Sequence, residues 1–368
     1  MKENFSFSSI QKYYEFFKKE KIDFTVPAIN IRTLTKDVAK TLFRAAKKER
    51  VKFFIIEIAR SEINYTKQTP REYFLNIKKA AKEENFQGEI FLQGDHFQIN
   101  KEDYFNNKKN KKEITFLKNL ILDAIKNKFY QIDLDFSPLK DEKENAFLTC
   151  EFLNFIRKKE PKNIKIALGA EVGEIGDKNT TKEQLKNFLN YYQKFLFEKK
   201  ILPEDGIIKL AVQIGTKHGG FVDKFGNLYN PKIDFKLLSS LSKIIKENNL
   251  AGLSFHGAST LSEKILQKLP KYNVLEVHLA TQFQNIILDS KYFPSTLKEK
   301  MYQWLKENFQ KKEEESEMQF YYRVRKHALG KFKKEISNMP KRNINKICEE
   351  LEEKFISLFR VLKVSNTI

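Results

Sequence analysis

Eight short apolar segments alternate with longer amphipathic segments along the first 290 residues of this chain. Runs such as Phe53-Phe54-Ile55-Ile56 lack the alternation of polar and apolar residues that one-sided strands show. They are therefore typical of strands buried on both faces, as in a parallel sheet. The expected strands are 23–30, 51–59, 88–95, 129–136, 163–171, 207–214, 250–256 and 274–281.

Helical patterns lie between these strands, and the repeated order of strand and helix predicts the fold class. Eight such alternations are the layout of an α/β (β/α)8 TIM barrel. An open, doubly wound sheet is the alternative, since periodicity does not distinguish a closed sheet from an open one. Thr180 and Glu183 are expected to form a capping box at the start of one helix. The expected helices are 36–50, 70–84, 114–128, 142–158, 182–200, 234–248 and 261–271.

The pattern changes after residue 290, which predicts two domains. Residues 1–290 should form a barrel catalytic domain, and residues 291–368 a charged helical C-terminal extension that packs on the barrel or on a second subunit. We expect Arg323, Arg325, Lys326 and His327 on a solvated helix face, with phosphate contacts from the first three as the alternative. The expected helices of the extension are 297–308, 318–336 and 343–362.

The composition argues against a membrane protein, a disulfide-rich secreted protein and a nucleic-acid-binding protein. No apolar run approaches the roughly 18 residues of a membrane span, and the N-terminus has no signal-peptide core. The two cysteines give no disulfide framework, so we expect a cytoplasmic protein without a membrane partner. The net charge of +20 suggests nucleic-acid binding, but only ten of the 68 basic residues are arginine. Arginine is preferred for bidentate phosphate and base contacts, so we favour no nucleic-acid partner.

Three of the five histidines occur in matching contexts. His96, His218 and His256 each stand at or just after the end of an expected strand, beside or close to glycine. Active sites of TIM barrels are built at the carboxyl ends of the strands, so these side chains should converge. Three imidazoles with an open fourth position are a catalytic zinc pattern. Asp95 lies beside the first of them.

The motifs around these residues resemble those of class II, zinc-dependent fructose-bisphosphate aldolases and their tagatose-bisphosphate relatives. The resemblance covers about residues 20–290. The motifs that carry it are Val26-Pro27-Ala28-Ile29-Asn30, Gly94-Asp95-His96, Asp135-Phe136-Ser137, Gly173-Glu174-Ile175-Gly176, Ile214-Gly215-Thr216-Lys217-His218-Gly219 and Phe255-His256-Gly257-Ala258-Ser259.

The resemblance implies a lyase of carbohydrate metabolism, such as glycolysis, that forms a homodimer or higher oligomer. Zinc, or cobalt or iron, would polarise the ketone of dihydroxyacetone phosphate, and a monovalent cation could assist. Asp95 would move the proton on the oxygen derived from the aldehyde. The metal ligands would be His96, His218, His256 and Glu174, and the residues binding the sugar phosphate would be Ser61, Gly219, Gly257, Ser259, His278 and Thr281.

Several positions depart from the family pattern on the substrate side. The family has glycines where this chain has Ala258 and Thr260, and a Lys-x-Asn where it has Glu276 and His278. Its mobile loop carries a glutamate for which Asp177 is the nearest candidate. A metal-binding homologue without catalytic activity is therefore the alternative to an active aldolase.

Overall fold

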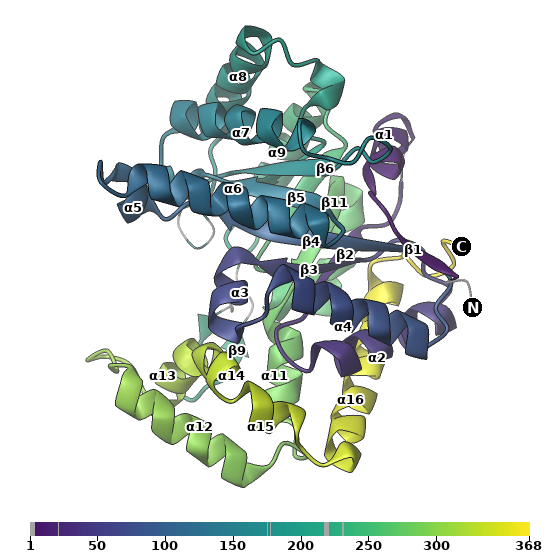
Figure 1. Ribbon diagram of the computed structural model, residues 1–368, viewed down its shortest axis with the longest axis vertical. Helices are drawn as coiled ribbons and strands as arrows, with labels where there is room; N and C mark the ends of the chain where they lie inside the picture. The colour runs from purple at the N-terminus through teal and green to yellow at the C-terminus, as the bar shows by residue number, and fades with distance from the viewer. Residues whose placement is uncertain (1–3, 21, 175, 177, 217–220, 230–231) are drawn as a thin grey trace.

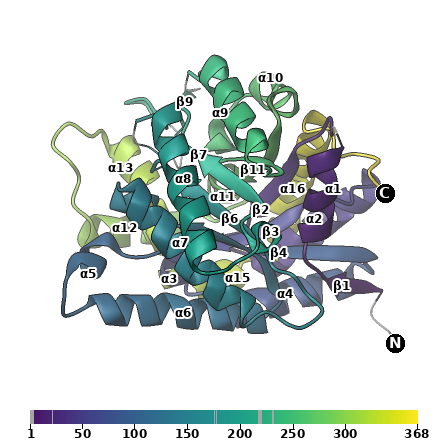
Figure 2. The same ribbon diagram turned by 90° about the horizontal axis from the view of Figure 1, so that it is seen from above.

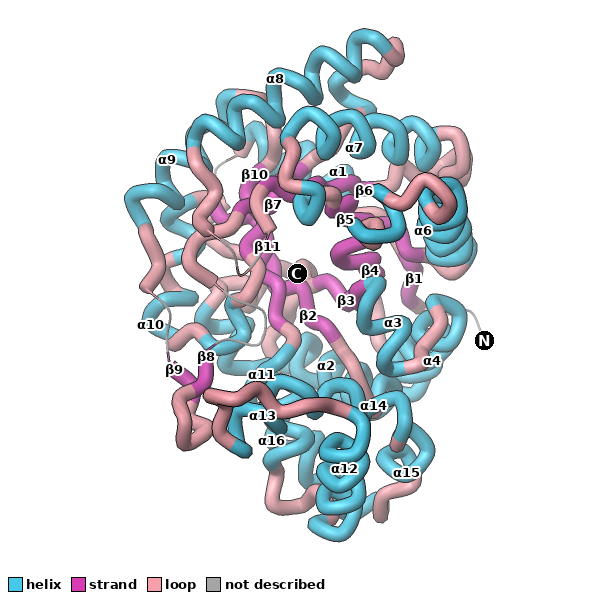
Figure 3. The backbone as a smooth tube through the Cα atoms, turned by 90° about the vertical axis from the view of Figure 1, so that its left-hand side faces the viewer, coloured by secondary structure: helices cyan, strands magenta, loops and turns pink. Residues whose placement is uncertain are grey.

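The core of the molecule is a closed barrel of eight parallel strands surrounded by helices (Figure 3). The computed structural model describes residues 4–20, 22–174, 176, 178–216, 221–229 and 232–368. Closure is shown by the pairing of the last barrel strand with the first, with His278 beside Ala28 in register. The predicted TIM barrel is confirmed, and the open sheet is excluded. The strands are β2 (Val26–Asn30), β3 (Ile55–Ala59), β4 (Gly88–Gln98), β5 (Phe129–Asp135), β6 (Ala167–Val172), β7 (Lys209–Val212), β10 (Gly252–Phe255) and β11 (Val274–Leu279).

Each expected outer helix is present except one, and three further helices, 60–66, 101–105 and 281–289, were not expected. The segment expected as a single helix at 261–271 forms the short α10 and a separate 3-10 turn, Leu269–Tyr272. Pro270 lies in the first turn of that second piece and has no N–H to continue a longer helix. The helices are α2 (Thr35–Lys48), α3 (Arg60–Thr66), α4 (Pro70–Glu83), α5 (Lys101–Phe105), α6 (Asn110–Lys126), α7 (Glu142–Arg157), α8 (Lys182–Glu198), α9 (Phe235–Glu247), α10 (Glu263–Leu266) and α11 (Thr281–Asp289).

The capping box of α8 is shifted by one residue from the expected position. Thr181 is the N-cap, and its hydroxyl and the side chain of Gln184 exchange hydrogen bonds with each other's backbone N–H. The prediction that used Thr180 and Glu183 is wrong. Thr180 is instead buried between two strand ends, where its hydroxyl donates to the carbonyl of Val172 and accepts from the N–H of Gln213.

Two N-terminal elements were not expected from the sequence. The strand β1 (Phe5–Phe7) pairs outside the barrel with β4, and α1 (Gln11–Lys19) follows it. Ile10, Tyr14 and Phe17 pack against residues at the starts of the barrel strands, such as Val26. The helix α1 therefore covers the amino-terminal end of the barrel, opposite the strand ends that carry the predicted site.

The C-terminal region is helical and packs on the barrel beside α2, α3 and α11 (Figures 1 and 2). The helix expected at 318–336 is broken into three pieces, the first two of which are joined by a 3-10 turn, Arg325–His327. At Gly330 an added Cβ would lie 2.2 Å from the carbonyl oxygen of Tyr65, so glycine permits close contact with α3. The helices are α12 (Ser295–Asn308), α13 (Glu317–Val324), α14 (Ala328–Lys331), α15 (Lys333–Ser337) and α16 (Lys341–Val361).

A short hairpin of β8 (Phe221–Val222) and β9 (Leu228–Tyr229) lies between β7 and α9 in the sequence. No helix in the described part of the chain is long and apolar enough to cross a membrane. The division into two domains at residue 290 stays a prediction.

Candidate functional site

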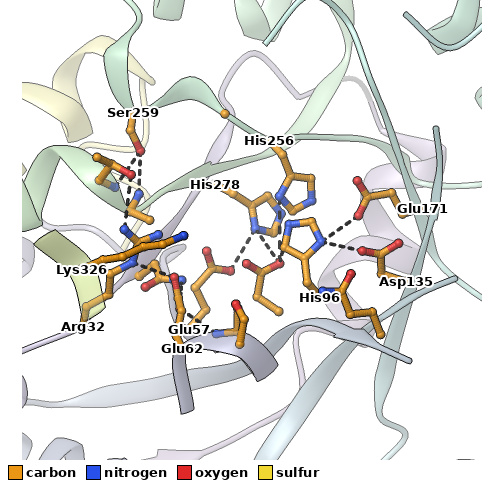
Figure 4. Close-up of a pocket in the computed structure, with 18 of the residues that line it drawn as sticks. Arg32, Glu57, Glu62, His96, Asp135, Glu171, His256, Ser259, His278 and Lys326 are labelled. Atoms are coloured by element: carbon orange, nitrogen blue, oxygen red, sulfur yellow. Dashed lines mark hydrogen bonds and ion pairs between the residues drawn. The ribbon is translucent and has the colours of Figure 1, made fainter. Parts of the chain in front are cut away.

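A pocket of about 220 Å³ opens at the carboxyl ends of the barrel strands (Figure 4). His218 and Gly219 lie outside the described residues. Every other residue predicted for the site lines this pocket: Ser61, Asp95, His96, Glu174, His256, Gly257, Ser259, His278 and Thr281.

A β-bulge at the end of β4 turns two consecutive side chains into the pocket. Adjacent residues of a regular strand point to opposite faces. Here Gly94 pairs with Ile132 and Phe97 with Leu134, so β4 contains one extra residue, and His96 has a φ of +42°. The ring of Phe97 packs over Gly94, where an added Cβ would lie 2.5 Å from it. The bulge therefore places Asp95 and His96 in one site.

Three imidazoles lie next to one another at the base of the pocket. The ring centroids of His96 and His256 are 4.4 Å apart, and those of His256 and His278 are 3.9 Å apart and nearly parallel. Nδ1 of His96 lies 3.0 Å from Oδ2 of Asp135 and 2.9 Å from Oε2 of Glu171. These contacts fix the ring orientation, as carboxylates do for histidines that bind metals.

Two overlapping sets of side chains at the base of the pocket fit a divalent cation. His96, Glu171 and His256 form one set, and Asp95, His256 and His278 form the other; within each set the ligand atoms lie within 4.8 Å of one another. A third set, Asp133, Glu276 and His278, lies deeper, where Lys209 already bonds both carboxylates. Oδ1 of Asp95 and Oε1 of Glu171 are buried and accept no hydrogen bond from any described residue. Such buried acceptors are costly unless a cation or donor reaches them, so the donor set fits a metal.

The electrostatics of this cluster reflect an excess of buried carboxylates. Burial raises the pKa of Asp95 to about 7, against the lowering effect of His96. Burial likewise raises the pKa of Glu171 to about 8, and nearby Asp135 adds to this. Burial alone would lower the pKa of His96, but Asp95 and Glu171 raise it well above its usual value. Because these pKa values are raised, the cluster keeps protons bound when no metal is present, and a bound cation could replace those protons.

Glu174 lies on the rim of the pocket rather than at its base. Its side chain is 43% exposed, and Oε2 is 3.5 Å from the ammonium of Lys140. Among the described carboxylates, Glu171 and Asp135 lie closer to His96. The role of Glu174 as a ligand stays a prediction, and Glu171 is a second candidate that comes from the same strand end.

The opposite end of the pocket presents hydrogen-bond donors. Oγ of Ser259 accepts from the backbone N–H groups of Ala280 and Thr281, at 2.8 and 3.1 Å. Gly257 has a φ of +70°, which suits glycine where the backbone turns beneath the pocket. Nη1 of Arg32 donates to Oγ1 of Thr281 at 3.3 Å.

A layer of buried charges lies inside the barrel beneath the imidazoles. The Lys209 ammonium donates to Oε1 of Gln93 at 2.8 Å and to Oδ2 of Asp133 at 2.9 Å, and it also bonds Glu276. Gly169 makes room for this layer, since an added Cβ would lie 2.2 Å from Oδ1 of Asp133. Nδ1 of His278, above it, lies 2.9 Å from Oε2 of Glu57.

Sequence reasoning missed Glu57 and Lys209. The available signal was a charged residue inside an otherwise apolar strand, as in Ile55-Ile56-Glu57-Ile58 and Ile207-Ile208-Lys209-Leu210. A charge at such a position must find a partner inside the barrel.

The basic segment of the extension does not form the expected solvated face. Arg325 is buried and makes two hydrogen bonds to Asp289, while Arg323 bonds Glu315. The ring of His327 stacks on Phe309 at 4.9 Å. That prediction is wrong because the break after α13 turns the segment onto the barrel. Lys326 lines the pocket instead.

Comparison with known proteins gives a family match over most of the chain. A sequence profile described as "Fructose-bisphosphate aldolase class-II" matches residues 11–352. Similar solved structures include the YdjI aldolase from Escherichia coli K12, at 14% identity, with 98% of each chain covered and a TM-score of 0.58. A fructose-bisphosphate aldolase from Campylobacter jejuni has 18% identity, 98% and 95% coverage and a TM-score of 0.61.

A probable tagatose 6 phosphate kinase from Sinorhizobium meliloti 1021 is similar at 14% identity, with 93% of this chain and 99% of that chain covered and a TM-score of 0.68. At these low identities, the structural likeness shows the shared fold alone.

Proposed function

The chain belongs to the class II fructose-bisphosphate aldolase family, and on that premise we propose that it catalyses metal-dependent, reversible aldol cleavage of a phosphorylated ketose. The substrate would be a ketose bisphosphate, fructose-1,6-bisphosphate or a similar phosphosugar, which yields dihydroxyacetone phosphate and an aldehyde. The observation that carries the proposal is the convergence of Asp95, His96 and His256 around buried carboxylate atoms without hydrogen-bond partners among the described residues.

His96 and His256 would hold the metal together with His218, which lies outside the described residues, and with Glu171 or Glu174. Zinc suits imidazole and carboxylate ligands, although cobalt or iron could occupy the same site. When bound, the ion supplies Lewis-acid polarisation of the substrate carbonyl.

Asp95 would act as the acid/base. In the cleavage direction its carboxylate accepts the proton of the hydroxyl on the carbon that becomes the aldehyde. The carbon–carbon bond then breaks, and its electron pair stays with the ketone-side fragment. A proton taken up from solvent at that carbon completes dihydroxyacetone phosphate, and Asp95 releases its own proton to solvent. In the reverse direction Asp95 returns the proton to the aldehyde oxygen. The position of Asp95 in the pocket beside His96 supports this role.

The remaining residues of the pocket would bind and orient the substrate. The backbone at Gly257 and the hydroxyl of Ser259 are placed to hold a phosphoryl group, as short runs of amide donors do. Ser61 and Thr281 line the same pocket. His278, held by Glu57, would contact the sugar at the position where the family carries asparagine.

Metal content and turnover together test the proposal. Wild-type protein should contain about one equivalent of zinc per chain and release dihydroxyacetone phosphate from at least one bisphosphate. His256→Ala should lose both properties, whereas Asp95→Asn should retain the metal and lose at least about a hundredfold in kcat, the usual contribution of a general acid or base. His327→Ala, a histidine outside the pocket, is the control for metal content.

Glu276 and His278 stand where the family has Lys-x-Asn. This difference favours a second candidate function, that of a metal-binding homologue without catalytic activity. Retained zinc with no turnover across a panel of phosphosugars would establish that function instead. For the active enzyme we further propose a cytoplasmic location. We also propose a homodimer or higher oligomer, and sedimentation analysis would test this oligomeric state.

A further inference from the structure

We propose that the C-terminal extension supplies part of the substrate-binding site through Lys326, which forms an anion-binding subsite with Arg32. The inference rests on the proposed function and names the group that the pocket recognises: a phosphoryl group at the end of the pocket remote from the imidazoles. In Figure 4 Lys326 and Arg32 lie side by side at that end, near Ser259.

The fold of the extension directs Lys326 towards the pocket. It lies in the 3-10 turn between α13 and α14, which packs against α3. Its Nζ lies 5.6 Å from the centre of the Tyr65 ring, and Tyr65 also lines the pocket. Among the described residues none forms an ion pair with Lys326, whereas Arg323 and Arg325 are each held by a carboxylate. Lys326 is the basic residue of this segment that remains available to a ligand.

The charges around Arg32 leave one positive charge in excess. Nε of Arg32 donates to Oε1 of Glu62 at 2.7 Å, and Nη1 donates to Thr281 and Gln284. Burial would raise the pKa of Glu62, but Arg32 keeps it lowered, so Glu62 is ionised and balances Arg32. The charge of Lys326 is then uncompensated. Burial and, after it, the nearby Arg32 lower the pKa of Lys326, while Glu62 acts in the opposite direction without forming an ion pair with it.

Ser259 and Arg32 each have hydrogens available to donate to a ligand. A hydroxyl has two lone pairs and one hydrogen. Because both lone pairs of Ser259 accept backbone N–H groups, its hydrogen must be donated elsewhere. No described residue accepts from Nη2 of Arg32, whose two hydrogens therefore also remain available. Lys326, Arg32 and Ser259 together present cationic and neutral donors to one end of the pocket.

The pocket is thus polarised along its length. Carboxylates and imidazoles, including Asp95 and His96, lie at one end, and the two cations lie at the other. A ligand with a carbonyl or hydroxyl group at one end and a phosphoryl group at the other matches this polarity. The extension therefore contributes to substrate recognition within the same chain.

Calorimetric titration of the metal-loaded protein tests the subsite without requiring turnover. The probes are dihydroxyacetone phosphate, inorganic phosphate and uncharged dihydroxyacetone. For Lys326→Met we expect the Kd of dihydroxyacetone phosphate to rise by roughly ten- to a hundredfold, the effect of losing one charge-assisted hydrogen bond. Lys326→Arg should restore most of the affinity. Lys331→Met, an exposed lysine five residues further on, is the matched control and should bind as wild type.

The outcomes separate this inference from the aldolase proposal. Equal affinity of wild type and Lys326→Met for dihydroxyacetone phosphate, or a wild type that binds neither phosphate probe, overturns the subsite. Equal losses for dihydroxyacetone and its phosphate would also overturn it, because the effect would not depend on the anion. Binding that depends on Lys326 in a protein that cleaves no phosphosugar would support the subsite and reject the aldolase.

Discussion

Replacing Lys209 with methionine should destabilise the protein by about 3 to 5 kcal/mol, because breaking a buried ion pair leaves a charge without its partner. The side chain of Lys209 is 1% exposed and that of Glu276 is fully buried. Burial alone would raise the pKa of Glu276, but Lys209 and His278 hold it at about 2. Compared with the usual 4.5, that pKa corresponds to about 3 kcal/mol in favour of the folded carboxylate.

Urea unfolding followed by far-UV circular dichroism at pH 7 measures this loss. Lys243→Met is the control, because Lys243 and Glu247 form an exposed pair for which we expect a change within about 0.5 kcal/mol. Adding Glu276→Gln to Lys209→Met should recover part of the stability. The stabilisation from Glu276 is present above about pH 4.5 and is lost as the pH falls towards 2. A loss below about 1 kcal/mol for Lys209→Met would refute the reasoning.

Three further predictions concern the site and its supports. Metal-free protein should lose thermal stability from pH 5 to pH 8. The reason is that buried Asp95 and Glu171, whose pKa values are raised to about 7 and about 8, favour the folded state only while they are protonated. Calorimetry should show this loss, and a smaller loss when zinc is added. His278→Asn should keep the metal but reduce kcat/KM by roughly two- to tenfold as the stack on His256 is lost, and unchanged kinetics would contradict this role. Thr180→Ala should cost about 2 kcal/mol and Thr181→Ala about 1 kcal/mol in urea unfolding, since the first loses two buried hydrogen bonds and the second an exposed cap; the reverse order would show that the cap matters more.

The barrel could be predicted from the sequence because burial on both faces leaves a local signature in each strand. The positions of Asp95, His96 and His256 at strand ends followed from the same pattern. The bulge that brings Asp95 and His96 to one side did not, since it depends on the pairing of β4 with β5. Strand periodicity alone would have placed these two side chains on opposite faces.

Other features depend on contacts between distant parts of the chain. The buried hydrogen bond between Thr180 and Gln213 forms only when the end of β7 is in place. The position of Lys326 likewise depends on the packing of the extension on α3. Thr180 was expected as a helix cap and Lys326 inside one continuous helix, and neither expectation holds. Local propensity locates a helix to within a residue or two, whereas tertiary packing decides which side chain becomes its cap and which reaches the pocket.

The hydroxyl of Tyr14 in α1 bonds the carboxylate of Glu276, 262 residues later in the chain. During synthesis, the buried hydroxyl of Tyr14 therefore has this partner only after the last barrel strand has been made. A nascent chain released before residue 274 would also leave Lys209 without one of its two carboxylates. Truncated chains of this length should therefore remain open to proteolysis, and protection should appear only once β11 has been made.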